Sequence, residues 1–410
     1  MARRNAADAL NSLGRIGRRH APGSAARKLP LLEALSRQQL KSARQVLRLH
    51  ELLCFLDAYP DDRRVRILVR RMLRNFPRRA DLRRHRAALA GSGIAGTDTP
   101  YRFFWPTARW ISLNWPGALV LDRDDPEHAK AILDALPQLP EPVQAELLRR
   151  RESPTLDVLD EFRPRGMSDA DYLISLFAAM PGDDFTREAF FDRVDPPFIL
   201  RAGNATPERT TTRFDRLPVQ FRHSPLKAAR PDLMREVRRP PRRVVPLRSR
   251  DADALVRLAR IAMITRERDL AAFQFANPRD AFLVDDGLGL GFAMVGTLPQ
   301  RRVLLPALFG GLTLQNGVPI GYVQADVLGR HAELSFNTFG TFRGGESARV
   351  FARFVAAIHH VFGCDGFSIE PYQLGAGNEE GIESGAWWFY RRFGFRPRTA
   401  AARRLAAREM

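Results

Sequence analysis

Two hydrophobic periodicities occupy different parts of this 410-residue chain. Up to about residue 200 the apolar residues recur at helical spacing, most clearly over 65–76, where they fall at i, i+3, i+4, i+7, i+8 and i+11. From about residue 251 they come in short runs of strand length, and Asn316-Gly317 between two such runs is a strong hairpin signal. The chain is therefore predicted to be an α+β protein, with a helical N-terminal region followed by a mixed α/β domain whose sheet is mostly antiparallel.

Composition sets the expected boundaries between these parts. Residues 1–28 are rich in Arg, Ala and Gly and are predicted to be a disordered basic tail. The helical region is expected over 29–200. Residues 201–250 are basic and contain prolines, which is typical of a linker or of an extended arm laid over the surface. The mixed α/β domain is expected over 251–400.

Within the mixed domain, the apolar runs predict individual elements. Strands are expected at 281–284, 291–295, 301–308, 312–315, 319–328, 332–339 and 366–370. Helices are expected at 347–362 and 385–393, and Gly310-Gly311 is expected to form a turn.

Charge is distributed unevenly, and this bears on possible partners. The net charge of +19 divides into +16 for residues 1–116, −9 for 117–200, +10 for 201–250 and +2 for 251–410. Residues 63–86 hold eleven arginines and one acid, and aromatic residues crowd 101–115. Together these segments could form a track for single-stranded nucleic acid. We favour the alternative in which the arginine face is solvated or docks on the acidic segment while the aromatics form a core.

The two cysteines, Cys54 and Cys364, are too few for a disulfide framework and indicate a cytoplasmic location. No apolar run approaches the ~18 residues that a membrane span needs, so no membrane association is expected. A metal site at His359-His360…Cys364 is not expected, because no second cluster of ligands is evident.

Three segments of the mixed domain suggest a family. They are Ile320-Gly-Tyr-Val-Gln-Ala325, Phe342-Arg-Gly-Gly-Glu-Ser-Ala-Arg349 and Ala386-Trp-Trp-Phe-Tyr-Arg-Arg-Phe-Gly-Phe-Arg-Pro397. With the order of helices and strands, they make residues 251–400 resemble the GNAT acyltransferase superfamily, which moves acyl groups from coenzyme A to amines. In the N-terminal quarter, residues 49–60 and 92–97 resemble an uncharacterised bacterial family to which no activity can be attached.

The resemblance implies a coenzyme site at the glycine-rich turn. The turn would hold the pyrophosphate through Phe342, Arg343, Gly344, Gly345 and Ser347. Glycines allow backbone N–H groups to point inward, and the N-terminus of the following helix adds positive potential. Glu346 departs from the family pattern, because it would place a negative charge inside an anion site.

The resemblance also implies catalytic residues. Glu333, on the strand before the turn, or Glu370, at the end of the next strand, would accept the proton of the amine, and Tyr390 would face the departing thiolate. The predicted function is N-acyl transfer from acetyl-CoA or another acyl-CoA, without a metal, to an amine on a small molecule or a peptide. Two alternatives stay open: a non-catalytic GNAT-like binding module, favoured by Glu346, and a basic protein associated with RNA or DNA.

Overall fold

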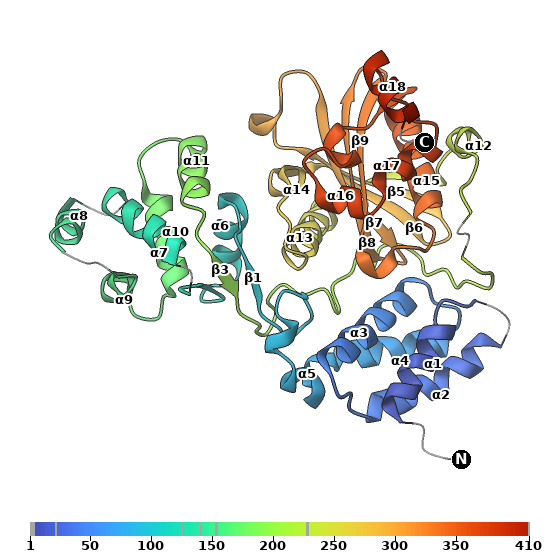
Figure 1. Cartoon of the computed structure of the whole chain (residues 1–410), viewed down its shortest axis with the longest axis horizontal. Coiled ribbons are helices and arrows are strands. Elements are labelled where there is room, and N and C mark those ends of the chain that lie inside the picture. The colour runs from blue at the N-terminus through green and yellow to red at the C-terminus, as the bar shows by residue number, and fades with distance from the viewer. Residues whose placement is uncertain are drawn as a thin grey trace.

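The computed structural model describes residues 5–20, 23–124, 126–139, 142–151, 155–226 and 229–408. It has the predicted α+β architecture, with helices in the N-terminal half and a sheet of seven strands in the C-terminal half (Figure 1).

The N-terminal helices are α1 (Ala6–Ile16), α2 (Ser24–Arg37), α3 (Ala43–Ala58), α4 (Arg63–Arg74) and the short α5 (Ala80–Arg84). The prediction of a disordered tail over 1–28 differs from the structure, which has α1 and the start of α2 there. Asn5 caps α1 by accepting a hydrogen bond from the backbone N–H of Ala7, and the helix buries Ala9, Leu10 and Leu13. These few apolar positions suffice to bury one face, although arginine and glycine dominate the composition.

Residues 99–200, which we name the middle module, pack around a second core, to which Ile264 of the C-terminal part also contributes. The module contains β1 (Thr99–Tyr101), α6 (Trp105–Asn114), β2 (Leu119–Leu121), α7 (Pro126–Ala135), α8 (Pro142–Arg149), α9 (Asp157–Phe162), α10 (Asp169–Ala179), α11 (Asp184–Val194) and β3 (Phe198–Leu200). Strand β3 pairs antiparallel with both β1 and β2. The predicted helical region 29–200 is thus two separately packed parts, the second of which includes strands.

The aromatic residues of 101–115 belong largely to the core of the middle module. Phe103, Trp105 and Trp115 are buried there, as the favoured alternative predicts. The arginine face of α4 does not dock on the acidic segment, because no ion pair between described residues joins α4 to residues 117–200. The ion pairs of the α4 arginines are with Asp57 of α3, with Asp215 and, from Arg64, with Asp62 at the helix N-cap.

The large sheet has the strand order β10-β9-β8-β7-β6-β5-β4, antiparallel except for the pair β9 and β10. The strands are β4 (Arg243–Pro246), β5 (Ala276–Gly287), β6 (Leu290–Thr297), β7 (Ala307–Gln315), β8 (Val318–Leu328), β9 (His331–Thr338) and β10 (Gly366–Ser368). The C-terminal helices are α13 (Arg250–Ile264), α14 (Ala271–Gln274), α15 (Ser347–Phe362), α16 (Glu379–Glu383), α17 (Ala386–Arg392) and α18 (Ala400–Arg408).

Two predictions for the sheet are wrong, and one is confirmed. Gly310-Gly311 is not a turn but lies inside β7, and the predicted strand 301–308 becomes regular only at Ala307. A Cβ atom on Gly311 would collide with Met294 and Val323, so the glycine is needed for close packing rather than for turning. Asn316-Gly317 does form the hairpin turn between β7 and β8, with positive φ at both residues.

A single hydrophobic core joins the N-terminal helices to the large sheet. Residues 201–250 cross between these two parts (Figure 1), and the regular elements among the described residues of 201–249 are α12 (Leu233–Arg238) and β4. The backbone N–H of Phe214 donates to the carbonyl of Gly317, and Arg353 of α15 donates to the carbonyl of Arg239, 2.8 Å away. No helix in the described part of the chain is both long and apolar enough to cross a bilayer.

Candidate functional site

Two adjoining cavities lie where β9 ends. The smaller, of about 270 Å³, is lined by the last residues of β9, the turn 343–347 and the helices α16 and α17. The larger, of about 670 Å³, lies between the same turn, α3 and the segment after α13. Asn337, Arg343 and Glu380 line both cavities, so the two spaces meet at these side chains.

The smaller cavity opens because β9 and β10 separate. Their parallel pairing covers three positions, from His331 opposite Gly366 to Glu333 opposite Ser368. Strand β9 continues to Thr338, whereas the chain after β10 turns away at Pro371. Among the described residues, no strand pairs with this edge of β9 beyond Glu333. The open edge of β9 therefore lies beside the cavity.

The predicted coenzyme turn borders the smaller cavity. Arg343, Gly344 and Ser347 line it, and Ser347 is the first residue of α15. Gly344 has φ of +73°, a conformation that glycine adopts without strain. Phe342 and Gly345 are buried beneath the turn. Three of the five predicted residues thus face the cavity and two support the turn.

Glu346 points away from the cavity, which removes the conflict that its charge would create. Its carboxylate is buried and accepts two hydrogen bonds from the guanidinium of Arg222, at 2.9 and 2.6 Å. The backbone N–H of Arg222 in turn donates to the carbonyl of Pro60. Glu346 therefore connects the turn to the crossing segment 201–250, and Arg222 neutralises the charge of its carboxylate beneath the turn.

Tyr390 lines the smaller cavity from α17, where only 3% of its surface is exposed. Burial raises the pKa of its hydroxyl, although a hydrogen bond with the backbone of Phe336 opposes this effect. Tyr390 is therefore protonated at neutral pH, as a proton donor to a thiolate must be.

Glu333 and Glu370 lie outside both cavities. Glu333 is half-buried and its carboxylate lies 3.4 Å from the hydroxyl of Ser368, while Glu370 is exposed. At ~3.3 Å per residue, Glu333 lies about 16 Å before the end of β9. Both carboxylates are close to Asp326, whose pKa is raised by burial and by these two negative charges. The structure thus does not bring the predicted bases to the turn.

The larger cavity is lined by charged side chains that the sequence patterns did not indicate. The cavity is lined by six arginines and two glutamates: Arg18, Arg48, Arg209, Arg266, Arg268, Arg343, Glu51 and Glu380. These residues come from six separate stretches of the chain, so no local motif could have revealed them.

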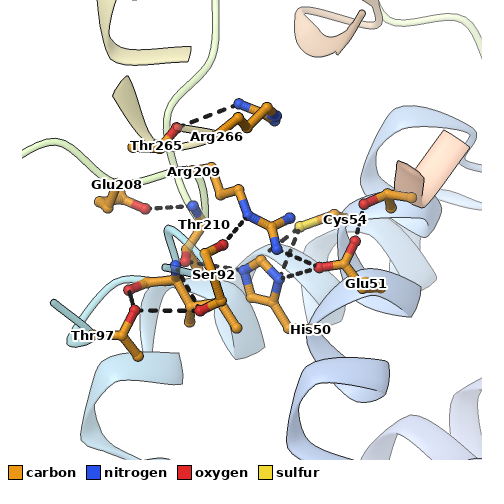
Figure 2. Close-up of polar contacts among 12 residues, drawn as sticks. His50, Glu51, Cys54, Ser92, Thr97, Glu208, Arg209, Thr210, Thr265 and Arg266 are labelled. Atoms are coloured by element: carbon orange, nitrogen blue, oxygen red, sulfur yellow. Dashed lines mark hydrogen bonds and ion pairs between the residues drawn. The ribbon is translucent and has the colours of Figure 1, made fainter. Parts of the chain in front are cut away.

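A polar network beside this cavity joins α3 to the loop 91–97 and to the crossing segment (Figure 2). Arg209 pairs with Glu51 at 2.7 Å, and His50 Nε2 lies 3.0 Å from the hydroxyl of Thr210. Burial opposes ionisation of Glu51, but Arg209 and His50 hold its pKa at about 2. Glu51 is therefore ionised and serves as the anionic centre of the network.

Cys54 belongs to the same network, with its sulfur 3.7 Å from His50 Nε2. Burial raises the pKa of the Cys54 thiol, and burial lowers the pKa of His50. Both groups are therefore uncharged at neutral pH, which is unlike the thiolate and imidazolium of a cysteine nucleophile.

Comparisons of the chain with family models, with curated proteins and with solved structures found no match. Among the described residues there is also no group of three or more His, Cys, Asp or Glu side chains that could hold a metal ion. Function must therefore be argued from the two cavities.

Proposed function

We propose that this chain is a GNAT-like N-acyltransferase that uses acyl-CoA, with the coenzyme bound in the smaller cavity. The observation that carries the proposal is the separation of β9 from β10 directly beside a glycine turn and the start of α15. An open strand edge offers backbone groups that the amides of a pantetheine chain can pair with. The turn and the positive end of α15 suit a pyrophosphate.

In this proposal the acceptor amine attacks the thioester carbonyl, the C–S bond breaks and the sulfur leaves as a thiolate. Tyr390 donates a proton or a hydrogen bond to that sulfur, which fits its place on the cavity wall. Glu380 lies where the cavities meet, so in this proposal it is the carboxylate next to the acceptor amine, in place of the predicted Glu333 or Glu370. Hydrogen bonds from Arg268 and Arg343 lower its pKa, so it is a weak base. The acceptor's ammonium group would first lose a proton to water. The free amine would then attack while donating a hydrogen bond to Glu380, and the second proton that nitrogen loses would balance the one that the sulfur gains.

A non-catalytic module that binds coenzyme A is the second candidate. It is favoured by the position of Glu333 and Glu370 away from the cavities. The structure gives the nucleic-acid alternative less support than the sequence did, because Phe103, Trp105 and Trp115 are buried and cannot stack on bases.

Calorimetry with coenzyme A and acetyl-CoA tests the proposal. We expect binding to the unaltered chain, and at least ten-fold weaker binding for Ser347→Trp, which fills the cavity beside the turn. Arg330→Glu is the matched control, because Arg330 is exposed just before β9, at the end away from the turn, and its ion pair among the described residues is with Asp365. No binding at millimolar coenzyme would contradict both candidates. Binding without release of free thiol in the presence of mixed amines would favour the module.

A further inference from the structure

The larger cavity holds more positive than negative charge. Glu51 pairs with Arg209 at 2.7 Å, and Glu380 pairs with Arg268 and Arg343 at 2.8 and 2.5 Å. These pairs use both glutamates that line the cavity. Within the described residues, the remaining three arginines of the lining, Arg18, Arg48 and Arg266, have no carboxylate within ion-pair distance. Arg18 and Arg48 bind neutral groups instead, namely backbone carbonyls and the side chain of Asn11.

Arg266 is the innermost of the three. Its Nη1 donates to the carbonyl of Ala262 at 2.9 Å, and its guanidinium lies 3.7 Å from the centre of the Phe339 ring. Its other two nitrogens have no partner in the described part of the chain. Burial, together with the nearby charge of Arg209, lowers the pKa of Arg266 to about 9. Glu51 offsets part of this effect, and an anion bound at the two remaining nitrogens would offset more of it.

We propose that the larger cavity binds an oxyanion, a carboxylate or a phosphate, through Arg266 and Arg48, and that this group belongs to the acyl acceptor. The acceptor would then be a small amine that also carries an acidic group. A volume of about 670 Å³ suits such a molecule. Arg266 and Glu380 line the same cavity, so one small molecule can contact Arg266 with its acidic group and place its amine beside Glu380, where the two cavities meet. The role as acceptor rests on the proposed function, whereas the binding of an anion does not.

Titration with inorganic phosphate tests the anion site in the full-length chain. Phosphate should raise the melting temperature of the unaltered protein, because a ligand that binds only the folded state stabilises it. Arg266→Gln should weaken phosphate binding at least ten-fold, and Arg48→Gln, on an exposed helix surface, about three-fold. If Arg266→Gln fails to fold, Arg48→Gln alone decides.

Arg257→Gln is the matched control for this titration. Arg257 lies nine residues earlier on α13 and also stacks on an aromatic ring, 4.7 Å from Trp115, but it does not line the cavity. Its substitution should leave phosphate binding unchanged. Equal binding by the unaltered protein and all three variants, or no effect of phosphate at all, would overturn the anion site.

Competition experiments identify the source of the anion. If coenzyme A and phosphate bind together, while O-phospho-L-serine displaces phosphate and L-serine does not, the acidic acceptor is supported. If coenzyme A itself displaces phosphate, the arginines bind the coenzyme and the assignment to the acceptor is overturned. If coenzyme A does not bind but phosphate does, the proposed function fails while the anion site stands.

Discussion

The carboxyl group of Asp192, in the middle module, has a pKa that the surrounding structure shifts strongly. Its carboxylate accepts a hydrogen bond from the backbone N–H of Trp105 at 3.0 Å. Burial, assisted by the nearby acids Glu188, Asp269 and Asp195, nevertheless raises its pKa to about 6. The folded state therefore binds this proton more tightly than the unfolded state does, and the ionised form destabilises the fold above about pH 6.

We accordingly expect Asp192→Asn to stabilise the protein more at pH 7.5 than at pH 5, by an amount of order 1 kcal/mol after allowance for partial solvation. Urea unfolding at the two pH values measures this difference. The control is Asp183→Asn at the N-cap of the same helix. Its exposed carboxylate has a lowered pKa, so its effect should not change between pH 5 and pH 7.5. The same pH dependence in both variants would contradict the prediction.

At this scale, sequence alone could locate Tyr390 and the turn residues, because they lie in contiguous segments with recognisable spacing. It could not place Glu333 or Glu370 relative to the cavities, because the point at which β9 and β10 separate leaves no trace in the alternation of apolar residues. Sequence patterns could not single out Arg266 either, for a different reason. Its surroundings come from α3, the crossing segment and the loop after β9, which only the tertiary fold brings together.

Helix α4 shows at the scale of one element how far periodicity can be trusted. The sequence predicted its apolar face correctly, and Val65, Val69 and Leu73 are buried. The opposite face is not uniform, however. Arg70 lies 2.9 Å from the buried carboxylate of Asp57, whereas its neighbour Arg71 is exposed. Helical spacing alone cannot separate these two arginines, because the difference depends on what packs beside the helix.

The two arginines therefore make a matched pair for substitution. Arg70→Gln should lower the free energy of unfolding by about 1–2 kcal/mol, because it weakens a charge-assisted hydrogen bond to a buried acid. Arg71→Gln should change it by less than about 0.5 kcal/mol, as is usual for surface positions. Urea unfolding of the two variants measures both values. Equal losses would show that the ion pair with Asp57 contributes little.

For the whole molecule, the fold class could be predicted from the sequence, but the division into two cores could not. Both the N-terminal helices and the middle module have helical patterns, and the boundary between them appears only in which residues pack together. One interpretation of the charge distribution was that the acidic segment 117–200 docks on the arginine face of α4, and it does not do so. It is partly balanced within the middle module, where Arg123 pairs with Asp160 and Asp169 at 2.8 and 2.7 Å.

Two separate cores predict two unfolding units. Three of the five tryptophans, Trp105, Trp110 and Trp115, lie in the middle module, so fluorescence reports mainly on that unit. Far-UV circular dichroism reports on helices in both units. We expect the urea transitions seen by the two probes to differ in midpoint. Coincident curves would mean that the middle module and the rest of the chain unfold together.

The packing of α3 against the sheet also affects how the chain can be made. Ala58, at the end of α3, receives a hydrogen bond from Asn316, which is 258 residues later in the sequence. At a synthesis rate of roughly 5–20 residues per second, α3 leaves the ribosome about 13–50 s before that partner exists. During this interval the apolar face of α3 has no sheet to cover it. The contact between α3 and the sheet can therefore form only after most of the chain has been made, whereas the contacts of α3 with α1 and α4 can form early.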